Sequence, residues 1–215
     1  MAGHVAAGVR AVKMKIGRAS IREDGERVRV VREAIGPDVA LMVDANAAYR
    51  AHEAVVMARH LEEHGVYWFE EPVAVDDLRG HASVAAASSV PVASGENEAS
   101  KQGFADLVLA GGARIINPDA EILGGITEFM KVASLADVHG VSVAPHGRQD
   151  LHVHLVTAIP NGLMVEYYRD NVDPLASVLM RSGPTLQGGE LYPSDAPGHG
   201  MVLDEAAAEK YRVYG

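Results

Sequence analysis

The sequence predicts an α/β fold built as a (β/α)8 barrel of the TIM type. Short apolar runs rich in Val and Ile alternate along the 215 residues with longer segments of helical period. Runs that are apolar throughout are typical of strands buried on both faces, and their alternation with helices indicates βαβ units. A charged residue stands at the end of each of seven runs, at intervals of 20 to 29 positions. Because only a closed barrel brings seven strand ends into one ring, we favour a barrel over an open sheet.

Seven strands and four helices are expected in chain order. The helix segments carry apolar residues at helical spacing, and one of them stops before Gly36-Pro37, a helix-ending signal. The expected strands cover residues 9–16, 39–43, 65–69, 90–93, 113–116, 141–144 and 163–165. The expected helices cover residues 24–35, 54–64, 124–139 and 204–211, the last with Asp204 as its N-cap.

The chain is expected to form a single domain in two parts. Residues 1–181 hold the alternating runs and form the barrel part, which carries the functional residues. Residues 182–215 form an irregular C-terminal tail with a short helix, because the segment 182–200 is rich in Gly and Pro. No Gly/Ser linker or low-complexity segment divides the two parts.

The composition excludes several classes of function. The chain has no cysteine, which removes disulfides and thiolate metal sites and favours a cytoplasmic location. A net charge of −10 without a basic stripe argues against nucleic acid as a partner. No uncharged apolar run approaches the ~20 residues of a membrane span, so no membrane partner is expected. The first residues lack the apolar core of a secretory signal.

Three successive strand ends carry carboxylates, namely Asp44, Glu70 and Glu96. A lone acidic residue after a strand is usually a turn former or a helix cap. Three carboxylates that converge without cations would instead repel one another and raise their pKa values. A divalent cation removes this repulsion, and ligands that are all oxygen favour Mg²⁺, or Mn²⁺, over softer metals. The sequence therefore predicts a magnesium site at these three strand ends.

Groups able to transfer protons flank the predicted metal site. Lys13 and Lys15 are two positions apart on one strand and point the same way. Asp119 and His146 end neighbouring strands, and a carboxylate beside an imidazole fixes its tautomer and raises its basicity. A metal with Lys15 on one side and His146 on the other suits removal of a proton beside a carboxylate.

Seven short motifs occur in a fixed order and spacing: Lys13-x-Lys15, Val43-Asp44-Ala45-Asn46, Trp68-Phe69-Glu70-Glu71-Pro72, Ser94-Gly95-Glu96, Asn117-Pro118-Asp119, Ala144-Pro145-His146 and Glu166. Together they resemble the enolase superfamily, in its mandelate racemase-like branch. The resemblance covers nearly the whole chain, from about residue 9 to the Pro197-Gly198-x-Gly200 tail. It implies a Lys or His base that works with Mg²⁺ to stabilise an enediolate.

The resemblance also implies a role for each residue at a strand end. Metal binding falls on the three carboxylates named above. Lys15 matches the base on one face of the substrate, with Lys13 beside it, and His146 with Asp119 matches the dyad on the other face. Glu166 matches an acid that hydrogen-bonds a substrate carboxylate oxygen and supports the enolate.

Two further residues are candidates for substrate binding. Asn46 matches a family position that often touches substrate. Arg148 comes soon after His146, where it is a candidate for contact with an anionic substrate or for a surface role. The substrate itself is expected to be a small carboxylate, a sugar acid, and the protein a homo-oligomer.

The beginning of the chain departs from the family pattern. Family members carry an N-terminal capping domain and a first barrel strand before the Lys-x-Lys strand. This chain starts about ten residues before that strand. The expectation is therefore an incomplete barrel of strands 2 to 8, with the capping domain absent.

The leading functional hypothesis is an acid-sugar dehydratase, a lyase that removes the proton α to a carboxylate and then expels the β-hydroxyl as water. Lysine on one face and histidine on the other also permits racemisation or epimerisation of a 2-hydroxy acid, which is the alternative. A further alternative is a truncated fragment that binds metal without turnover, because the capping domain is expected to be absent.

Several other residues have a functional interpretation that we set against a structural one. Glu71 alternates to the opposite face from Glu70, which favours a structural role. His152 and His154 suggest an H-x-H metal pair, but in a helix these positions face apart, which favours structure. Gly124-Gly125 fits no nucleotide motif and is interpreted as a helix start.

Overall fold

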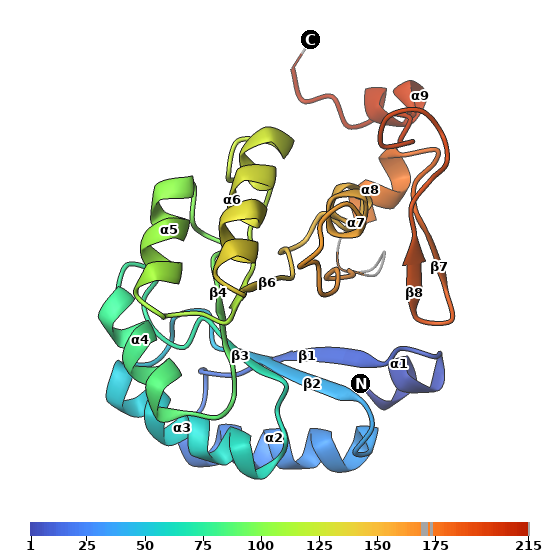
Figure 1. Cartoon of the computed structure of the whole chain (residues 1–215). Helices are drawn as coiled ribbons and strands as arrows, with labels where there is room; N and C mark the ends of the chain where they lie inside the picture. The colour runs from blue at the N-terminus through green and yellow to red at the C-terminus, as the bar shows by residue number, and fades with distance from the viewer. Residues whose placement is uncertain (169–171, 173, 215) are drawn as a thin grey trace.

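The structure is a computed structural model that describes residues 1–168, 172 and 174–214 (Figure 1). At its centre lies one sheet of six parallel strands, which are neighbours in the order of the chain. The strands are β1 (Ala11–Lys15), β2 (Ala40–Asp44), β3 (Trp68–Glu70), β4 (Val92–Ser94), β5 (Ile115–Ile116) and β6 (Ser142–Val143).

A helix follows each strand of this sheet, as the sequence predicts for an α/β fold. Figure 1 shows α2 to α6 together on one side of the sheet. The helices are α2 (Ile21–Ile35), α3 (Ala51–Glu63), α4 (Leu78–Ala87), α5 (Lys101–Leu109), α6 (Ile126–Val138) and α7 (Gln149–Thr157). Parallel strands need such crossovers because the chain must return to the starting end of the sheet before each new strand.

Helix α2 shows how local sequence sets the bounds of these elements. The Ser20 hydroxyl accepts the backbone N–H of Glu23, and the Glu23 carboxylate accepts the Ser20 N–H, which is a capping box. The helix ends at Gly36, in agreement with the predicted stop. Val28 and Ile35 on one face are buried against the sheet side of the core.

The core lies between the sheet and its helices in two main clusters. One gathers side chains from α2, α3 and the first four strands around Phe69. The other gathers side chains from α5, α6 and α7 around Phe104 and Phe129. All three rings have 0% exposure, so the layer between the sheet and the helices is closely packed.

The seventh predicted strand, 163–165, is not a strand in the structure. Only Gly162 pairs with the sheet, through an isolated parallel bridge to Val143, and the Leu163 N–H donates to the Val143 carbonyl at 2.8 Å. Within the described residues no strand pairs with the far side of this segment, and its side chains are half-buried. The sheet therefore has six strands, and β1 pairs with β2 alone among the described strands.

The C-terminal segment is more ordered than its composition predicts. Strands β7 (Thr185–Gln187) and β8 (Glu190–Tyr192) form an antiparallel hairpin inside the segment that we expected to be irregular. Its two-residue turn is Gly188-Gly189, both with positive φ, which is a strong hairpin signal that the composition alone conceals. The short helix α9 (Glu205–Glu209) is confirmed, and Asp204 caps it by accepting the Ala207 N–H. The helices α1 (Ala2–Ala6), α4, α5 and α8 (Pro174–Leu179) were not expected.

None of the helices in the described part of the chain is both long and apolar enough to cross a membrane. The 15-residue α2, for example, carries charged side chains along its length.

Candidate metal and proton-transfer site

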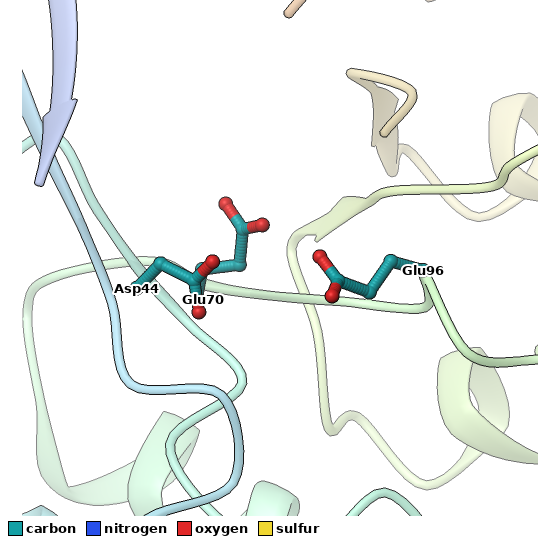
Figure 2. Close-up of side chains that lie close together, drawn as sticks. All are labelled: Asp44, Glu70 and Glu96. Carbon is teal, nitrogen blue, oxygen red and sulfur yellow. The ribbon is translucent and has the colours of Figure 1, made fainter. Parts of the chain in front are cut away.

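Three carboxylates meet at the carboxyl ends of β2, β3 and β4. Asp44 and Glu70 are the last residues of their strands and lie opposite each other in the register, and Glu96 follows β4. One oxygen from each lies within 4.8 Å of the others, and all three residues are buried. Figure 2 shows the three side chains directed into the same space. The predicted convergence of these strand ends is thus present in the structure.

The positive charges near the cluster do not offset the effect of burial on the pKa values of Glu70 and Glu96. Burial raises the pKa of Glu70 to about 7, although Lys13 acts to lower it. Burial, and then the charge of Glu71, raise the pKa of Glu96 above its ordinary value. The buried Oε2 atom of Glu96 has no hydrogen-bond partner among the described residues. An orphaned oxygen within a cluster made only of carboxylates fits a hard divalent cation such as Mg²⁺.

The two lysines of β1 reach this cluster differently. The Lys13 ammonium lies 2.6 Å from Glu70 Oε1 and 2.8 Å from Glu166 Oε1. Burial acts to lower the pKa of Lys13, but Glu70 and Glu166 outweigh it and hold the pKa above its ordinary value, so Lys13 is a cation. Lys15 pairs with Asp44 Oδ2, and its side chain is 56% exposed. Lys15 can therefore meet a bound molecule, whereas Lys13 is held between carboxylates.

Asp119 and His146 form the expected pair on the opposite side of the cluster. His146 Nδ1 lies 3.0 Å from Asp119 Oδ2, and the Glu121 N–H donates to Asp119 Oδ1 at 2.8 Å. The hydrogen bond that His146 donates to Asp119 raises the pKa of His146 above its ordinary value, against the opposing effect of burial. The other ring nitrogen, Nε2, lies 3.8 Å from Glu96 Oε2, so it is the ring nitrogen on the side of the carboxylate cluster.

We expect Asp119→Asn to lower the pKa of His146, because it removes the main group that stabilises imidazolium. Proton NMR titration of the His146 ring measures this pKa, and exposed Asp137→Asn on α6 is the matched control. The raised folded-state pKa means that this pairing stabilises the fold fully below pH 6.5 and is lost as the pH rises through the folded-state pKa. An unchanged His146 pKa in Asp119→Asn would contradict the prediction.

Glu166 and Asn46 both lie at the cluster. The Glu166 carboxylate bridges Lys13 and the Gly147 N–H, which donates to Oε2 at 2.9 Å. Burial acts to raise the pKa of Glu166, but Lys13 and the hydrogen bonds lower it overall, so this carboxyl is ionised in the present arrangement. The Asn46 N–H donates to Asp44 Oδ1 at 2.8 Å and its amide lies 3.4 Å from Glu96 Oε1. Its role in substrate binding stays a prediction.

Arg148 is occupied by neighbouring carboxylates. Its guanidinium pairs with Glu121 and, at 3.0 Å, with Asp150. These contacts join the loop after β5 to the first turn of α7 and leave the guanidinium partly exposed. A substrate carboxylate would have to compete with two carboxylates of the chain, and its contact with Arg148 stays a prediction.

Two aromatic residues of the site were missed in the sequence. The Trp68 indole N–H donates to Glu70 Oε2 at 2.9 Å, and the Tyr168 hydroxyl lies 3.5 Å from His146 Nε2. Trp68 stands two positions before Glu70 on one strand, so the alternation of side chains could have found it. Tyr168 stands two positions after Glu166, a spacing that would have found it in the same way had that segment been treated as extended.

A cavity of about 680 Å³ opens beside these groups, between β1 and the segment 164–168. Lys13, Lys15 and Glu166 line one part of it, and the rest is lined mainly by apolar side chains such as Met42 and Met164. The volume is in the range of small-molecule sites in proteins. Lys13, Lys15 and Glu166 therefore face a space that a small ligand can enter, whereas the three clustered carboxylates and His146 are not among its lining residues.

We expect Gly95→Ala to damage the site through the backbone before Glu96. Gly95 has a φ of +131°, and a Cβ there would lie 2.5 Å from Cε1 of Phe104, which is fully buried. The expected loss is about 2–4 kcal/mol in the free energy of unfolding, measured by urea denaturation. Gly140→Ala has a positive φ in open space and serves as the control, with an expected loss of about 1 kcal/mol. Equal losses in the two variants would contradict the steric argument.

The fold and the site together define a class of protein, an α/β protein with a cluster of carboxylates that could hold a metal ion between a lysine and an Asp–His pair. Its family follows from the family model described as "Enolase C-terminal domain-like", which matches residues 1–207. The chain belongs to this family, as the motifs at its strand ends imply.

The similarity extends to characterised relatives and solved structures. L-talarate/galactarate dehydratase of Salmonella typhimurium is 36% identical over 200 residues, which are 93% of this chain and 49% of that protein. 3,6-Anhydro-alpha-L-galactonate cycloisomerase of Streptomyces coelicolor is also 36% identical over 200 residues, 93% of this chain and 54% of the relative. The crystal structure of L-talarate dehydratase from Polaromonas sp. JS666 with Mg and L-glucarate aligns with a TM-score of 0.89 at 34% identity. That alignment covers 96% of this chain and 56% of the other.

The comparisons also show how far the similarity reaches. The chain spans about half the length of the curated relatives that it matches. Those relatives include both a dehydratase and a cycloisomerase, so membership of the family does not by itself define the reaction.

Proposed function

We propose that this chain carries the active site of an acid-sugar dehydratase, a lyase that acts through abstraction of the proton α to a carboxylate. The observation that carries the proposal is the placement of two proton-transfer groups at the two ends of the carboxylate cluster. Lys15 lies beside Asp44, and His146 lies beside Glu96. The dehydratases among the relatives, and the L-glucarate bound in one related structure, support a sugar acid as the substrate class.

Asp44, Glu70 and Glu96 would hold Mg²⁺, which supplies stabilisation of the negative charge that develops on the substrate carboxylate. Lys13, as a buried cation, favours the same negative charge from the side of β1. The related structure with bound Mg supports this assignment.

The proton steps fall to groups of this chain. His146 accepts the α-proton at Nε2, because its Nδ1 is bonded to Asp119, or Lys15 accepts it at Nζ from the other face. The protonated group then donates to the β-hydroxyl as its C–O bond breaks, so that water leaves and a 2-keto-3-deoxy acid forms after tautomerisation.

The fold supports this site as part of a (β/α)8 barrel. In such barrels the carboxyl ends of the strands carry the catalytic residues, and the candidate residues here lie at or just after the ends of parallel strands. We propose that the sheet is a wall of this barrel. We also propose that residues 182–215 belong to the same domain, because the His199 carbonyl lies 3.2 Å from His154 Nε2 of α7.

Racemisation or epimerisation of a 2-hydroxy acid is the second candidate, favoured by the presence of one proton-transfer group at each end of the cluster. Incubation of the chain with Mg²⁺ and sugar acids in ²H₂O separates the candidates. Galactarate, L-talarate, arabinonate and rhamnonate are suitable substrates to test, since relatives act on acids of these names. A 2-keto-3-deoxy product, detected with semicarbazide, supports dehydration.

Deuterium at the α-carbon of both epimers, without a keto product, would support racemisation or epimerisation instead. Binding of Mg²⁺ without exchange or product for any of the acids would contradict the proposed activity. That result would favour a chain that binds metal without turnover.

A further inference from the structure

His152 lies completely buried in the first turn of α7, with both ring nitrogens bonded to backbone groups of other loops. Its Nδ1 lies 2.7 Å from the carbonyl oxygen of Gly147. The backbone N–H of Ala120 donates to its Nε2 at 3.1 Å. Side chains in a helix point back toward its N-terminus, which brings this ring over the loop that precedes α7.

These two partners permit one form of the ring. A carbonyl only accepts, so Nδ1 must carry a proton, and an amide N–H only donates, so Nε2 must be bare. The neutral Nδ1–H tautomer meets both demands, whereas imidazolium would place two N–H groups against each other at Ala120. Burial lowers the pKa of His152, which favours the neutral ring. His152 therefore joins two loops through two hydrogen bonds of fixed direction.

The two loops are those of the dyad. Gly147 directly follows His146, and Ala120 directly follows Asp119. The N–H of Gly147 donates to Glu166. Gly147, whose carbonyl accepts from His152, therefore also contacts a third residue of the site. The aromatic ring of Phe129 on α6 stacks on His152, with centroids 5.8 Å apart and planes inclined by 23°. The ring is thus held on its nitrogens and on one face.

We propose that His152 is a positioning residue that sets the Asp119–His146 hydrogen bond by tying the loops after β5 and β6 together. The proposal rests on the proposed function for its catalytic consequence, because the dyad matters only if His146 transfers a proton. A ring that touches neither substrate nor metal ligands acts here through backbone geometry. A misplacement of a catalytic group by about 1 Å can lower a rate by about 100-fold.

Two other histidines show that burial or helix position alone does not produce this arrangement. His154, two positions along the same helix, is half-buried and lies near the His199 carbonyl, away from the dyad loops. His81 on α4 is also fully buried, but its Nε2 has no hydrogen-bond partner among the described residues. His154→Phe is therefore a matched control for His152→Phe.

Nitrogen-15 NMR of the unmodified chain is the first test. We expect His152 as the neutral Nδ1–H tautomer and a slowly exchanging Nδ1 proton on His146, identified by its loss in His146→Asn. In His152→Phe, which keeps an aromatic ring against Phe129, the His146 Nδ1 proton is expected to exchange at least tenfold faster. His154→Phe should leave it unchanged. An Nε2–H tautomer of His152, or an unchanged His146 proton in folded His152→Phe, would overturn the proposal.

A second variant covers the case in which His152→Phe does not fold. His152→Asn keeps a donor for the Gly147 carbonyl but cannot reach the Ala120 N–H. We expect faster hydrogen exchange of the Ala120 amide and of the His146 Nδ1 proton together. Loss of protection at Ala120 with the His146 proton unchanged would show that the hydrogen bonds of His152 join the loops without setting the Asp119–His146 hydrogen bond. That result would overturn the proposal.

Kinetics separate this proposal from the proposed function. In His152→Phe, the kcat of α-proton exchange should fall about 100-fold for the epimer whose α-proton His146 removes, with KM nearly unchanged. Exchange of the epimer whose α-proton Lys15 removes should be nearly unchanged. Equal loss for both epimers would overturn the positioning role. If the unmodified chain exchanges no α-proton at all, the proposed function fails, while the NMR measurements still decide whether His152 positions the dyad.

Discussion

Glu70→Gln is expected to weaken Mg²⁺ binding by at least about 100-fold, because groups that only support metal ligands already change affinity by 10–100-fold. Glu70 is the middle member of the carboxylate cluster, with 0% exposure, and pairs with Lys13 at 2.6 Å. The substitution removes one negative charge and leaves the Lys13 cation without that partner. Both effects act against a divalent cation.

Isothermal titration calorimetry at pH 8 measures this affinity, at a pH where Glu70 is largely ionised, since its pKa is about 7. A rise of the thermal midpoint with Mg²⁺, present in the unmodified chain and absent in Glu70→Gln, gives an independent measure. Glu63→Gln at the exposed end of α3 changes the net charge equally and should bind as the unmodified chain does. Unchanged affinity in Glu70→Gln would reject the metal assignment.

Lys15→Met and His146→Asn are expected to abolish α-proton exchange for opposite epimers of one substrate, by about 100- to 10,000-fold each. Lys15 lies at the Asp44 end of the cluster and His146 at the Glu96 end, so we expect them to approach a bound α-carbon from different sides. Each variant removes one proton acceptor and leaves the metal ligands and the other acceptor in place.

Proton NMR in ²H₂O with each pure epimer measures the exchange. Exposed Lys101→Met on α5 and exposed His139→Asn after α6 are the matched controls, and neither should change either rate. If one site variant loses exchange with both epimers while it still binds Mg²⁺ and substrate, the two-sided mechanism is wrong. If the unmodified chain itself shows no exchange, the proposed activity is wrong.

The positions of the candidate site residues could be predicted because these residues lie at or just after the ends of parallel strands. The strands that end at Asp44 and Glu70 are short apolar runs, and parallel strands that follow one another place their carboxyl ends at one edge. The same argument brought Asp119 and His146 together, and the structure shows them 3.0 Å apart. The spacing of these residues in the sequence, about one βα unit each, was sufficient to predict that they lie at the same edge of the sheet.

Other features depend on contacts between segments that no local pattern reports. The apolar run 163–165 has the composition of a strand, but strand formation also needs a continuous ladder of hydrogen bonds with a neighbouring strand, and this segment has only one isolated bridge. His152 carries the same helical signal as His154, and only the packing of α7 against the loops after β5 and β6 distinguishes them.

The sequence by itself determined the α/β order, the family and the residues that end the strands, because alternation and strand-end chemistry are local and repeat along the chain. Only the tertiary structure decided how those residues share charge. Lys13 became a buried cation between Glu70 and Glu166, Lys15 stayed half-exposed at Asp44, and Glu96 kept an oxygen without a partner among the described residues. These differences arise because burial and the distance between charges are properties of the packed chain, and a difference of a few ångströms decides the charge of a group.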